Sequence, residues 1–384
     1  MILTQCAVCA TDLGLTLGKK CGRCNTRYCG PECQVQHWKE GGHDQLCKKI
    51  KKAGGAEQFH ANQKYTEAVA VAAEKCADDT KGQTCYICTQ ALHWKTKEGL
   101  VRGCSCRGTA GFVHVSCLAE QAKILVAEAE ENNLGPKVFD ERFDRWVTCS
   151  LCKQRYYGVV WCALGWACWK TYVGRPETDE VRHHAMGWLA GGLYGVERHE
   201  EALSVQEAEL SLMRRAGRHE GNITANMLTM QGNLANTYQK LGRRQDALRL
   251  RREVYSGRLQ LFGEEHIDTL SGADNYANGL IDLNRFEEAR SLLRRTVPVA
   301  RRVLGESNNI TLRMRCLYAA SLYQDPAATL DDMRESVTMF EETGRTAQRV
   351  MGGANPLTMG MERHLGLARM ALHARETPSP RGAA

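Results

Sequence analysis

The chain lacks the short motifs that mark the common nucleotide-binding and hydrolytic sites. No G-x-G-x-x-G, P-loop, G-x-S-x-G or H-E-x-x-H pattern occurs in its 384 residues, and each of these would supply a phosphate cradle, a nucleophile or a catalytic metal. The N-terminal MILTQCAVCATD has neither the basic start nor the apolar core of a secretory signal. We therefore expect a cytoplasmic or nuclear protein without catalytic residues of its own.

Long apolar runs are missing as well. About 20 apolar residues are needed to cross a bilayer, whereas the stretch 159–173 (VVWCALGWACWKTYV) is shorter and contains Lys170. This stretch predicts a buried, aromatic-rich helix, and a membrane partner is not expected. The chain is also too long for a single core at roughly 100 to 200 residues per domain, so we expect several modules.

Cysteine is abundant but confined to one part of the chain. Of 18 cysteines, 15 precede residue 153, and most of them are paired. Reduced thiols in an intracellular protein indicate metal binding rather than disulfides. The formal charge of +7 also falls to about +1 when fourteen ligand thiolates and four Zn²⁺ ions, together −6, are included. Nucleic acid is therefore not expected as a partner.

The first ligand set has the spacing of a small zinc module. It consists of four pairs, Cys6-x2-Cys9, Cys21-x2-Cys24, Cys29-x3-Cys33 and His43-x3-Cys47. Zinc takes four roughly tetrahedral N or S ligands, so eight ligands predict two sites. About 50 residues bury little apolar surface, and the metal must replace the missing core.

The segment YCGPECQVQHW, followed by His43 and Cys47, resembles a MYND zinc finger. This resemblance implies interleaved sites, one made by Cys6, Cys9, Cys29 and Cys33 and the other by Cys21, Cys24, His43 and Cys47. It also places Gln34 and Trp38 where MYND domains that bind proline-containing peptides form their groove. The alternative is that Trp38 only packs the small domain.

A second ligand set follows with a different spacing. Its pairs are Cys85-x2-Cys88, Cys104-x-Cys106, His114-x2-Cys117 and Cys149-x2-Cys152. The segment GCSCRGTAGFVHVSCL resembles a RING-CH domain. The resemblance implies one zinc site from Cys85, Cys88, His114 and Cys117 and another from Cys104, Cys106, Cys149 and Cys152. Four-ligand sites leave no open position, so all four zinc ions are expected to be structural.

The RING-CH resemblance also raises the question of ubiquitin transfer. Ligases of this type hold a ubiquitin-conjugating enzyme with an apolar residue in the first zinc loop and a cation after the last ligand, and Ile87 and Lys153 occupy these positions. However, Gln121 stands where the family usually has Trp. Two hypotheses therefore remain, a ubiquitin-ligase adaptor that recruits a conjugating enzyme and a scaffold that bridges partner proteins without ubiquitin transfer.

The second half of the chain repeats itself. NLANTYQKLGRRQDAL (233–248) matches NYANGLIDLNRFEEAR (275–290) at an offset of 42, and WLAGGLYGVERHEEAL (188–203) is an earlier copy. Units of this kind stack into a solenoid, and the pattern resembles the tetratricopeptide repeats of kinesin light chains. The resemblance implies that client peptides contact Asn233, Asn236, Asn275 and Asn278, although a buried network or helix capping would also explain them.

The sequence therefore predicts a multidomain protein, with two small cross-brace zinc-stabilised domains followed by an all-α tetratricopeptide-type solenoid. The expected order is a MYND-type finger at 1–50, a helical linker at 51–81, a RING-CH-like zinc domain at 82–157, an aromatic-rich helix capping the solenoid at 158–182, helical repeats at 183–370 and a disordered tail at 371–384. Its expected role is protein–protein interaction.

Overall fold

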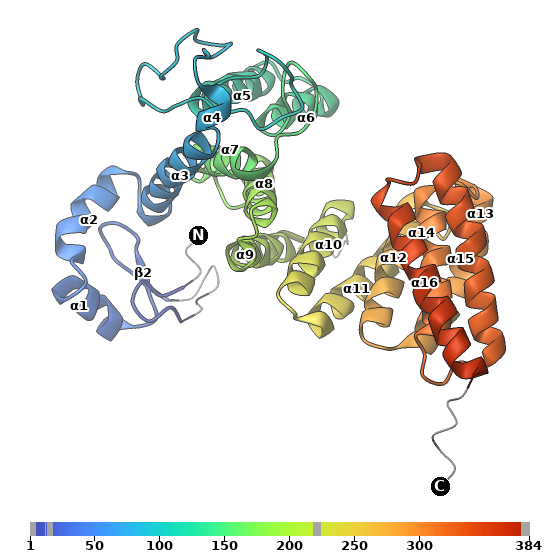
Figure 1. Ribbon diagram of the computed structural model, residues 1–384. Helices are drawn as coiled ribbons and strands as arrows, with labels where there is room; N and C mark the ends of the chain where they lie inside the picture. Colours follow the sequence, from blue (N-terminus) through green and yellow to red (C-terminus); the bar gives the residue numbers. More distant parts are fainter. Residues whose placement is uncertain (1–4, 12, 14–17, 218–223, 378–384) are drawn as a thin grey trace. The chain divides into compact units, whose positions relative to one another are not determined.

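The computed structural model describes residues 5–11, 13, 18–217 and 224–377 (Figure 1). The chain divides into two compact units, Met1–Asn222 and Ile223–Ala384. The described residues are predominantly helical, with helices α1 to α16 and one two-stranded sheet. The expected fold class is confirmed: cysteine clusters in the N-terminal half are followed by helical repeats.

The first zinc module is small and has little apolar core. Strand β1 (Lys19–Lys20) pairs antiparallel with β2 (Arg27–Tyr28). Helix α1 (Pro31–Lys39) starts with a proline at its first position, where a missing N–H costs nothing, and α2 (His43–Lys52) follows it. Helix α1 buries none of its residues, and the core beneath consists mainly of cysteines around Tyr28 and Ile50.

Helix α3 (Ala56–Lys75) occupies most of the predicted linker 51–81, with α4 (Ala77–Thr80) behind it. Its buried residues follow one helical face, Ala56, Ala61, Tyr65, Ala68, Val69 and Ala72. This spacing produces an apolar stripe, which packs against helix α7 (Gly158–Tyr172). The segment is therefore part of a packed core and not a free connection.

The second zinc module is built mainly from loops. Its bridges join Val101 to Val113 and Thr148 to Arg155. The long interval between Cys117 and Cys149 holds helix α5 (Val115–Glu131), helix α6 (Pro136–Phe143) and a 3₁₀ turn (Asp144–Trp146). The α5–α6 hairpin is closed by an ion pair between Arg142 and Glu128 at 2.6 Å.

One continuous apolar core joins the second module to the helices that follow it. The core runs from Ala61 to Leu212 and includes residues of α3, the zinc loops, α7, α8 (Glu180–Gly195) and α9 (His199–Gly217). Trp146, Trp166 and Trp169 are its largest fully buried side chains. The unit boundary lies at 222/223, so the helix pair α8–α9, predicted as the start of the solenoid at 183, falls in the first unit and shares this core with the second zinc module.

Two glycines allow α7 and α8 to lie against each other with almost no space between them. A Cβ on Gly192 of α8 would lie 2.9 Å from Cys162 Cα and 3.1 Å from Trp161 O. Conversely, a Cβ on Gly165 of α7 would lie 3.0 Å from Leu189 Cα. Because the obstructing atoms belong to backbone, they cannot rotate out of the way.

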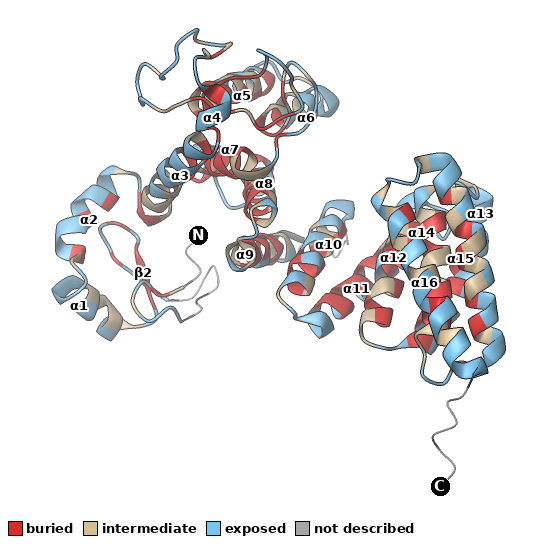
Figure 2. Cartoon of the chain, in the orientation of Figure 1, coloured by how far each residue is buried: buried red, intermediate tan, exposed pale blue. Residues whose placement is uncertain are grey.

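The described residues of the second unit form seven helices, which follow one another along the chain (Figure 1). They are α10 (Ala225–Lys240), α11 (Arg244–Phe262), α12 (Ile267–Asp282), α13 (Phe286–Leu304), α14 (Asn309–Tyr323), α15 (Leu330–Met351) and α16 (Pro356–Glu376). Gly263, Gly305 and Gly352 follow α11, α13 and α15 with φ of 80°, 88° and 82°, a conformation that glycine adopts at no steric cost. The buried residues face the neighbouring helices (Figure 2).

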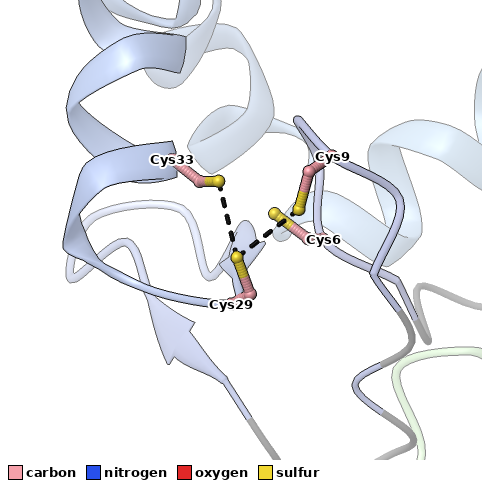
Figure 3. A group of neighbouring side chains, drawn as sticks. All are labelled: Cys6, Cys9, Cys29 and Cys33. Atoms are coloured by element: carbon pink, nitrogen blue, oxygen red, sulfur yellow. Dashed lines mark hydrogen bonds between the residues drawn. The ribbon is translucent and has the colours of Figure 1, made fainter.

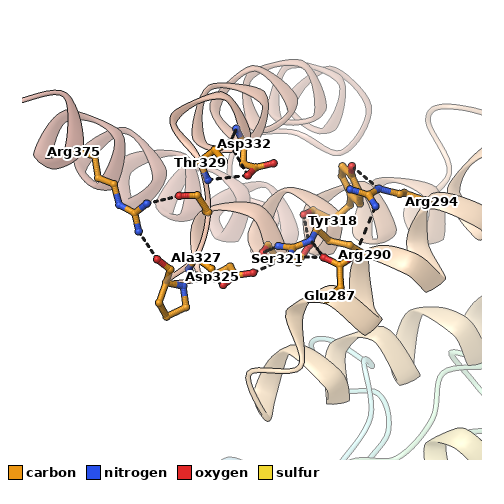
Figure 4. Close-up of polar contacts among 12 residues, drawn as sticks. Glu287, Arg290, Arg294, Tyr318, Ser321, Asp325, Ala327, Thr329, Asp332 and Arg375 are labelled. Atoms are coloured by element: carbon orange, nitrogen blue, oxygen red, sulfur yellow. Dashed lines mark hydrogen bonds and ion pairs between the residues drawn. The ribbon is translucent and has the colours of Figure 1, made fainter.

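Polar contacts fix the connection between α14 and α15 (Figure 4). Arg290 of α13 donates to Ser321 O at 2.9 Å and pairs with Asp325 at 2.8 Å. Thr329 and Asp332 form a reciprocal capping box at the start of α15. Arg375, near the end of α16, donates to Pro326 O at 2.7 Å.

The predicted boundary between the repeats and the tail, at 370/371, lies too early in the chain. Helix α16 continues to Glu376, so the first residues of the tail predicted at 371–384 are helical and tied to the preceding repeat. The rest of that segment, 378–384, lies outside the described residues.

The close contact between α7 and α8 generates a stability prediction. Gly192→Ala should lower the free energy of unfolding of the N-terminal unit by about 1 to 3 kcal/mol, because the methyl group overlaps backbone that cannot move. Thermal and urea unfolding measure the change. The same substitution at Gly344 of α15, where nothing lies within 4 Å of an added Cβ, should be neutral or stabilising by up to about 1 kcal/mol. Equal destabilisation by both variants would contradict the close packing.

Candidate zinc centres and interaction surfaces

Four groups of cysteine and histidine side chains converge in the structure. In each group the four potential ligand atoms lie within 4.8 Å of one another. The groups are Cys6, Cys9, Cys29 and Cys33; Cys21, Cys24, His43 and Cys47; Cys85, Cys88, His114 and Cys117; and Cys104, Cys106, Cys149 and Cys152. These are the same quartets that the two family resemblances imply.

The four Cys-x2-Cys pairs share one backbone turn. The residue after the second cysteine is left-handed in each, with φ of 56°, 60°, 61° and 59° at Ala10, Asn25, Thr89 and Lys153. Its N–H donates to the carbonyl of the first cysteine, at 3.1, 2.9, 2.8 and 3.1 Å respectively. In the third pair, the N–H groups of Ile87 and Cys88 also donate to Cys85 Sγ, at 3.4 and 3.5 Å. Such N–H donors stabilise a thiolate.

The first quartet joins the Cys6–Cys9 turn and Cys29, which directly follows β2, to Cys33 of α1 (Figure 3). Cys29 Sγ lies 3.5 Å from Cys9 Sγ and 3.4 Å from Cys33 Sγ. The Thr11 hydroxyl lies 3.0 Å from Cys9 Sγ, and its hydrogen bond helps to lower the pKa of Cys9 to about 6. Cys9 is thus prepared to act as a thiolate, the form that binds zinc.

The second quartet is buried at all four positions. His43 presents Nε2 to the group, 3.4 Å from Cys24 Sγ, and Cys21 Sγ lies 3.9 Å from Cys47 Sγ. The Thr26 hydroxyl lies 3.1 Å from Cys24 Sγ. His37 is outside the quartet, and its Nδ1 lies 3.0 Å from the Tyr28 hydroxyl.

In the second module, His114 is oriented by a backbone carbonyl. Its Nε2 lies 3.3 Å from Ala91 O, which requires Nε2 to carry the proton and donate. Nδ1 is then free to bind metal, 3.3 Å from Cys88 Sγ and 3.7 Å from Cys117 Sγ. An outer hydrogen bond of this kind is usual for a zinc-bound histidine.

The donor sets fit zinc. Thiolates at 2.3 Å from a tetrahedral ion are separated by about 3.8 Å, and the observed Sγ–Sγ separations of 3.4 to 3.9 Å are close to this value. All four sites have four protein ligands and no open position, so the zinc is structural. The expected cofactor, Zn²⁺ at four sites, is confirmed by these clusters.

The two residues predicted to dock a conjugating enzyme lie on two loops of the second module. Ile87 lies in the loop of Cys85 and Cys88, and Lys153 lies in the loop of Cys149 and Cys152. Ile87 is 36% exposed, and Lys153 is exposed in its left-handed turn. Tyr86 Oη lies 3.0 Å from Ser150 Oγ, which ties the loops to each other. Sequence reasoning missed Leu151, which is 49% exposed beside this link. Gln121 is half-buried on α5.

The MYND-type surface is open. Trp38 is 43% exposed, and its ring contacts His43 with centroids 5.8 Å apart. Gln34 lies one turn earlier on α1, on the same face as Trp38. Both proposed roles of Trp38, in packing and in peptide contact, thus have a structural basis, because the ring contacts His43 and is also partly exposed to solvent.

Three of the four predicted peptide-binding asparagines line one groove in the second unit. Asn233 and Asn236 of α10 and Asn275 of α12 surround a cavity of about 140 Å³, together with Arg251 and Arg258 of α11. Asn278 is absent from the groove lining and instead donates to Asp282 at 3.4 Å. The structure therefore gives Asn278 the local polar contact that was the alternative explanation for these residues.

Comparison with known families matches three segments. Residues 6–47 match the MYND finger, residues 85–133 the RING-variant domain and residues 224–302 the tetratricopeptide repeat. The chain contains all three domain types. Each resemblance seen in the sequence is thereby confirmed, and the combination is that of a zinc-containing protein-interaction adaptor. No curated protein matches the chain.

Solved structures of repeat proteins are similar to the chain. A putative kinesin light chain with nearly identical TPR-like repeats from Podosopora anserina is 18% identical, with a TM-score of 0.42, and covers 62% of this chain and 98% of its own. BtubC from P. vanneervenii is 13% identical, with a TM-score of 0.37, over 70% of this chain and 96% of its own. Within the described residues, no helix is long and apolar enough to cross a membrane.

The quartets generate a prediction about metal content. The purified chain should contain four zinc ions, and Cys85→Ser should contain at least one fewer, because a hydroxyl is a poor zinc ligand. Mass spectrometry of the bound metal measures the content. Cys76→Ser is the matched control, since Cys76 is also buried but belongs to no quartet. Two or fewer ions in the wild type, or four in Cys85→Ser, would contradict the assignment.

Proposed function

We propose that this chain is an adaptor of the ubiquitin system in the cytoplasm or nucleus. Its RING-variant module recruits a ubiquitin-conjugating enzyme, while the MYND finger and the helical repeats hold client proteins. The supporting observation is the pair of zinc loops joined through Tyr86 and Ser150, which carry exposed Ile87, Leu151 and Lys153. An apolar patch beside a cation suits a protein partner with apolar and acidic residues.

The zinc sites support recruitment rather than direct chemistry. Each has four protein ligands, so zinc cannot activate a water molecule there. What the metal supplies is a rigid pair of loops, which reduces the entropy lost on binding a partner. Rate enhancement would then come from the conjugating enzyme that the loops orient.

Two separate surfaces suit client recognition. Exposed Trp38 with Gln34 one turn away offers an aromatic face and an amide to an extended, proline-containing segment. The groove of Asn233, Asn236 and Asn275 offers side-chain amides that can bond to a peptide backbone. Arg258, whose guanidinium donates to the backbone carbonyl of Asp268, adds positive charge to this groove and favours acidic peptides there.

The second candidate is a scaffold that bridges proteins without ubiquitin transfer. Gln121 favours it, because a half-buried glutamine on α5 replaces the aromatic residue that the RING-CH family usually has at that position. A conjugating enzyme would lose a large apolar contact, and aromatic residues often dominate the binding energy of an interface.

The two candidates differ in an autoubiquitination assay against a panel of conjugating enzymes. We expect wild type to form ubiquitin chains with at least one enzyme and Ile87→Ala to lower the rate about tenfold, as expected for a central apolar contact of about 1 to 2 kcal/mol. Val138→Ala on α6 is the matched control, since Val138 is 40% exposed and belongs to neither of the loops that carry Ile87 and Lys153. It should retain the wild-type rate.

Each outcome of that assay separates the hypotheses. If the wild type forms no ubiquitin chains with any conjugating enzyme, only the scaffold hypothesis remains. Activity of Ile87→Ala equal to that of Val138→Ala would show that transfer does not use the proposed loops.

Peptide binding at the MYND-type surface is tested separately. Trp38→Ala should weaken binding of a labelled proline-rich peptide at least tenfold, because it removes the exposed aromatic face. Fluorescence anisotropy measures the affinity, and Gln36→Ala, at an exposed position on the opposite face of the same helix, is the control. Retained zinc in Trp38→Ala would show that the module is folded. Equal affinity of the two variants would leave Trp38 with a packing role alone.

A further inference from the structure

We propose that the N-terminal unit contains another protein-binding site, a groove for an acidic segment that carries an apolar side chain. The groove has a volume of about 790 Å³ and lies between α3, α5, α7 and the loop at 93–96. Tyr65, Ser116 and Lys170 lie on its inner side, and exposed Trp94 lies at its edge. A volume of this size accommodates several peptide side chains.

The loop that carries Trp94 is an ordered turn. It repeats the backbone of the zinc-binding pairs, because Lys97 has φ of 59° and its N–H donates to His93 O at 2.9 Å. His93 N–H in turn donates to Glu98 O at 3.0 Å. The zinc-binding turns have cysteine at their first and fourth positions. This turn has His93 and Thr96 there, and His93 Nδ1 lies 2.8 Å from Thr96 Oγ1. The turn thus holds Trp94, 68% exposed, without burying it in the fold.

Lys170 supplies the electrostatic argument. It is a half-buried ammonium on the otherwise apolar helix α7, with Nζ 4.2 Å from the centre of the Tyr65 ring. Among the described residues, no carboxylate lies within ion-pair distance of Lys170. Burial and the nearby positive charge of Lys95 lower its pKa, although Glu98 opposes them. An anionic ligand would offset part of the cost of holding this cation away from water.

The remaining charges of the groove leave it positive. Glu98 accepts hydrogen bonds from Ser116 N at 2.7 Å and from Ser116 Oγ at 2.8 Å, so it is engaged at the start of α5. Lys123 is paired with Glu120 at 3.6 Å. Glu98 keeps its charge, so Lys95, Lys123 and Lys170 against Glu98 and Glu120 leave a small positive excess to attract an acidic ligand. Exposed Trp94 is available for an apolar side chain.

The occupant that this chemistry favours is a peptide. A free phosphate would leave Trp94 exposed and most of the groove empty. A membrane or nucleic acid would meet Glu120 beside the lysines, on a chain whose charge is near neutral with zinc bound. The site is also distinct from the proposed conjugating-enzyme surface, because Gln121 projects from a different face of α5 than the groove residues Ser116, Ala119 and Lys123.

The test uses the zinc-loaded full chain and fluorescein-labelled nonapeptides. Each peptide has glutamates flanking a central Phe, Trp or Leu, and matched peptides have glutamine in place of every glutamate. We expect at least one acidic peptide to bind and its glutamine version to bind at least tenfold more weakly. Lys170→Gln and Trp94→Ala should each weaken binding about tenfold. Lys137→Gln, which removes an exposed lysine of α6, should not.

Several results would overturn the proposal. The first is that no acidic peptide binds. The second is that the glutamine peptides bind as tightly as the acidic ones. The third is that Lys170→Gln and Trp94→Ala both bind with the affinity of the wild type. Displacement of the peptide by inorganic phosphate at equal affinity, or preferential binding of anionic lipid vesicles or single-stranded RNA, would assign the groove to another ligand. Because Trp94 is exposed, Trp94→Ala keeps the test valid even if Lys170→Gln fails to fold. The measurement requires no ubiquitin transfer, so it is independent of the ligase hypothesis.

Discussion

Coordination by cysteine thiolates is the interaction on which the N-terminal half of the structure depends. The first module buries very little besides its own ligands, Tyr28 and Ile50, and a segment this small cannot offset its conformational entropy by apolar burial alone. A structural zinc site contributes about 10 to 16 kcal/mol of apparent binding free energy. The turns that present the cysteine pairs also place four non-glycine residues, Ala10, Asn25, Thr89 and Lys153, in the left-handed conformation, which costs roughly 1 kcal/mol or more for each.

Helix α7 connects this metal-dependent part to the repeat-like helices. Gly103 of the second module lies so close that an added Cβ would be 2.5 Å from Val160 Cβ, and a Cβ on Gly192 of α8 would be 2.9 Å from Cys162 Cα of α7. Trp166 and Trp169 fill the space between these elements and are completely buried. The zinc loops therefore do not project from a flexible linker. Their position is set by a core that also includes the helix pair α8–α9.

The ligand spacing was sufficient to predict the metal sites, because a tetrahedral ion restricts which residues can meet. Periodicity was likewise sufficient for the repeats, since small residues such as Ala235 and Ala277 recur where helices pack closely. The sequence could not show that α3 packs on α7 or that α8–α9 belong with the zinc modules, because these contacts join distant segments. Leu151 and the groove beside Trp94 were missed for the same reason. Position in a repeat also does not reveal that Asn278 has a local partner, Asp282.

The turn at 93–98 shows how one backbone geometry serves two purposes in the same module. Where cysteines occupy its first and fourth positions, as at Cys85 and Cys88, the turn delivers two ligands to an ion. Where His93 and Thr96 occupy them, a hydrogen bond of 2.8 Å closes the turn, and the side chain between them is free to face a partner. Ile87 is the third residue of its turn and Trp94 is the second residue of its own, and both side chains are exposed. A metal-supported scaffold can present apolar side chains to solvent at little cost in its own stability, because its folding does not rely on burying them.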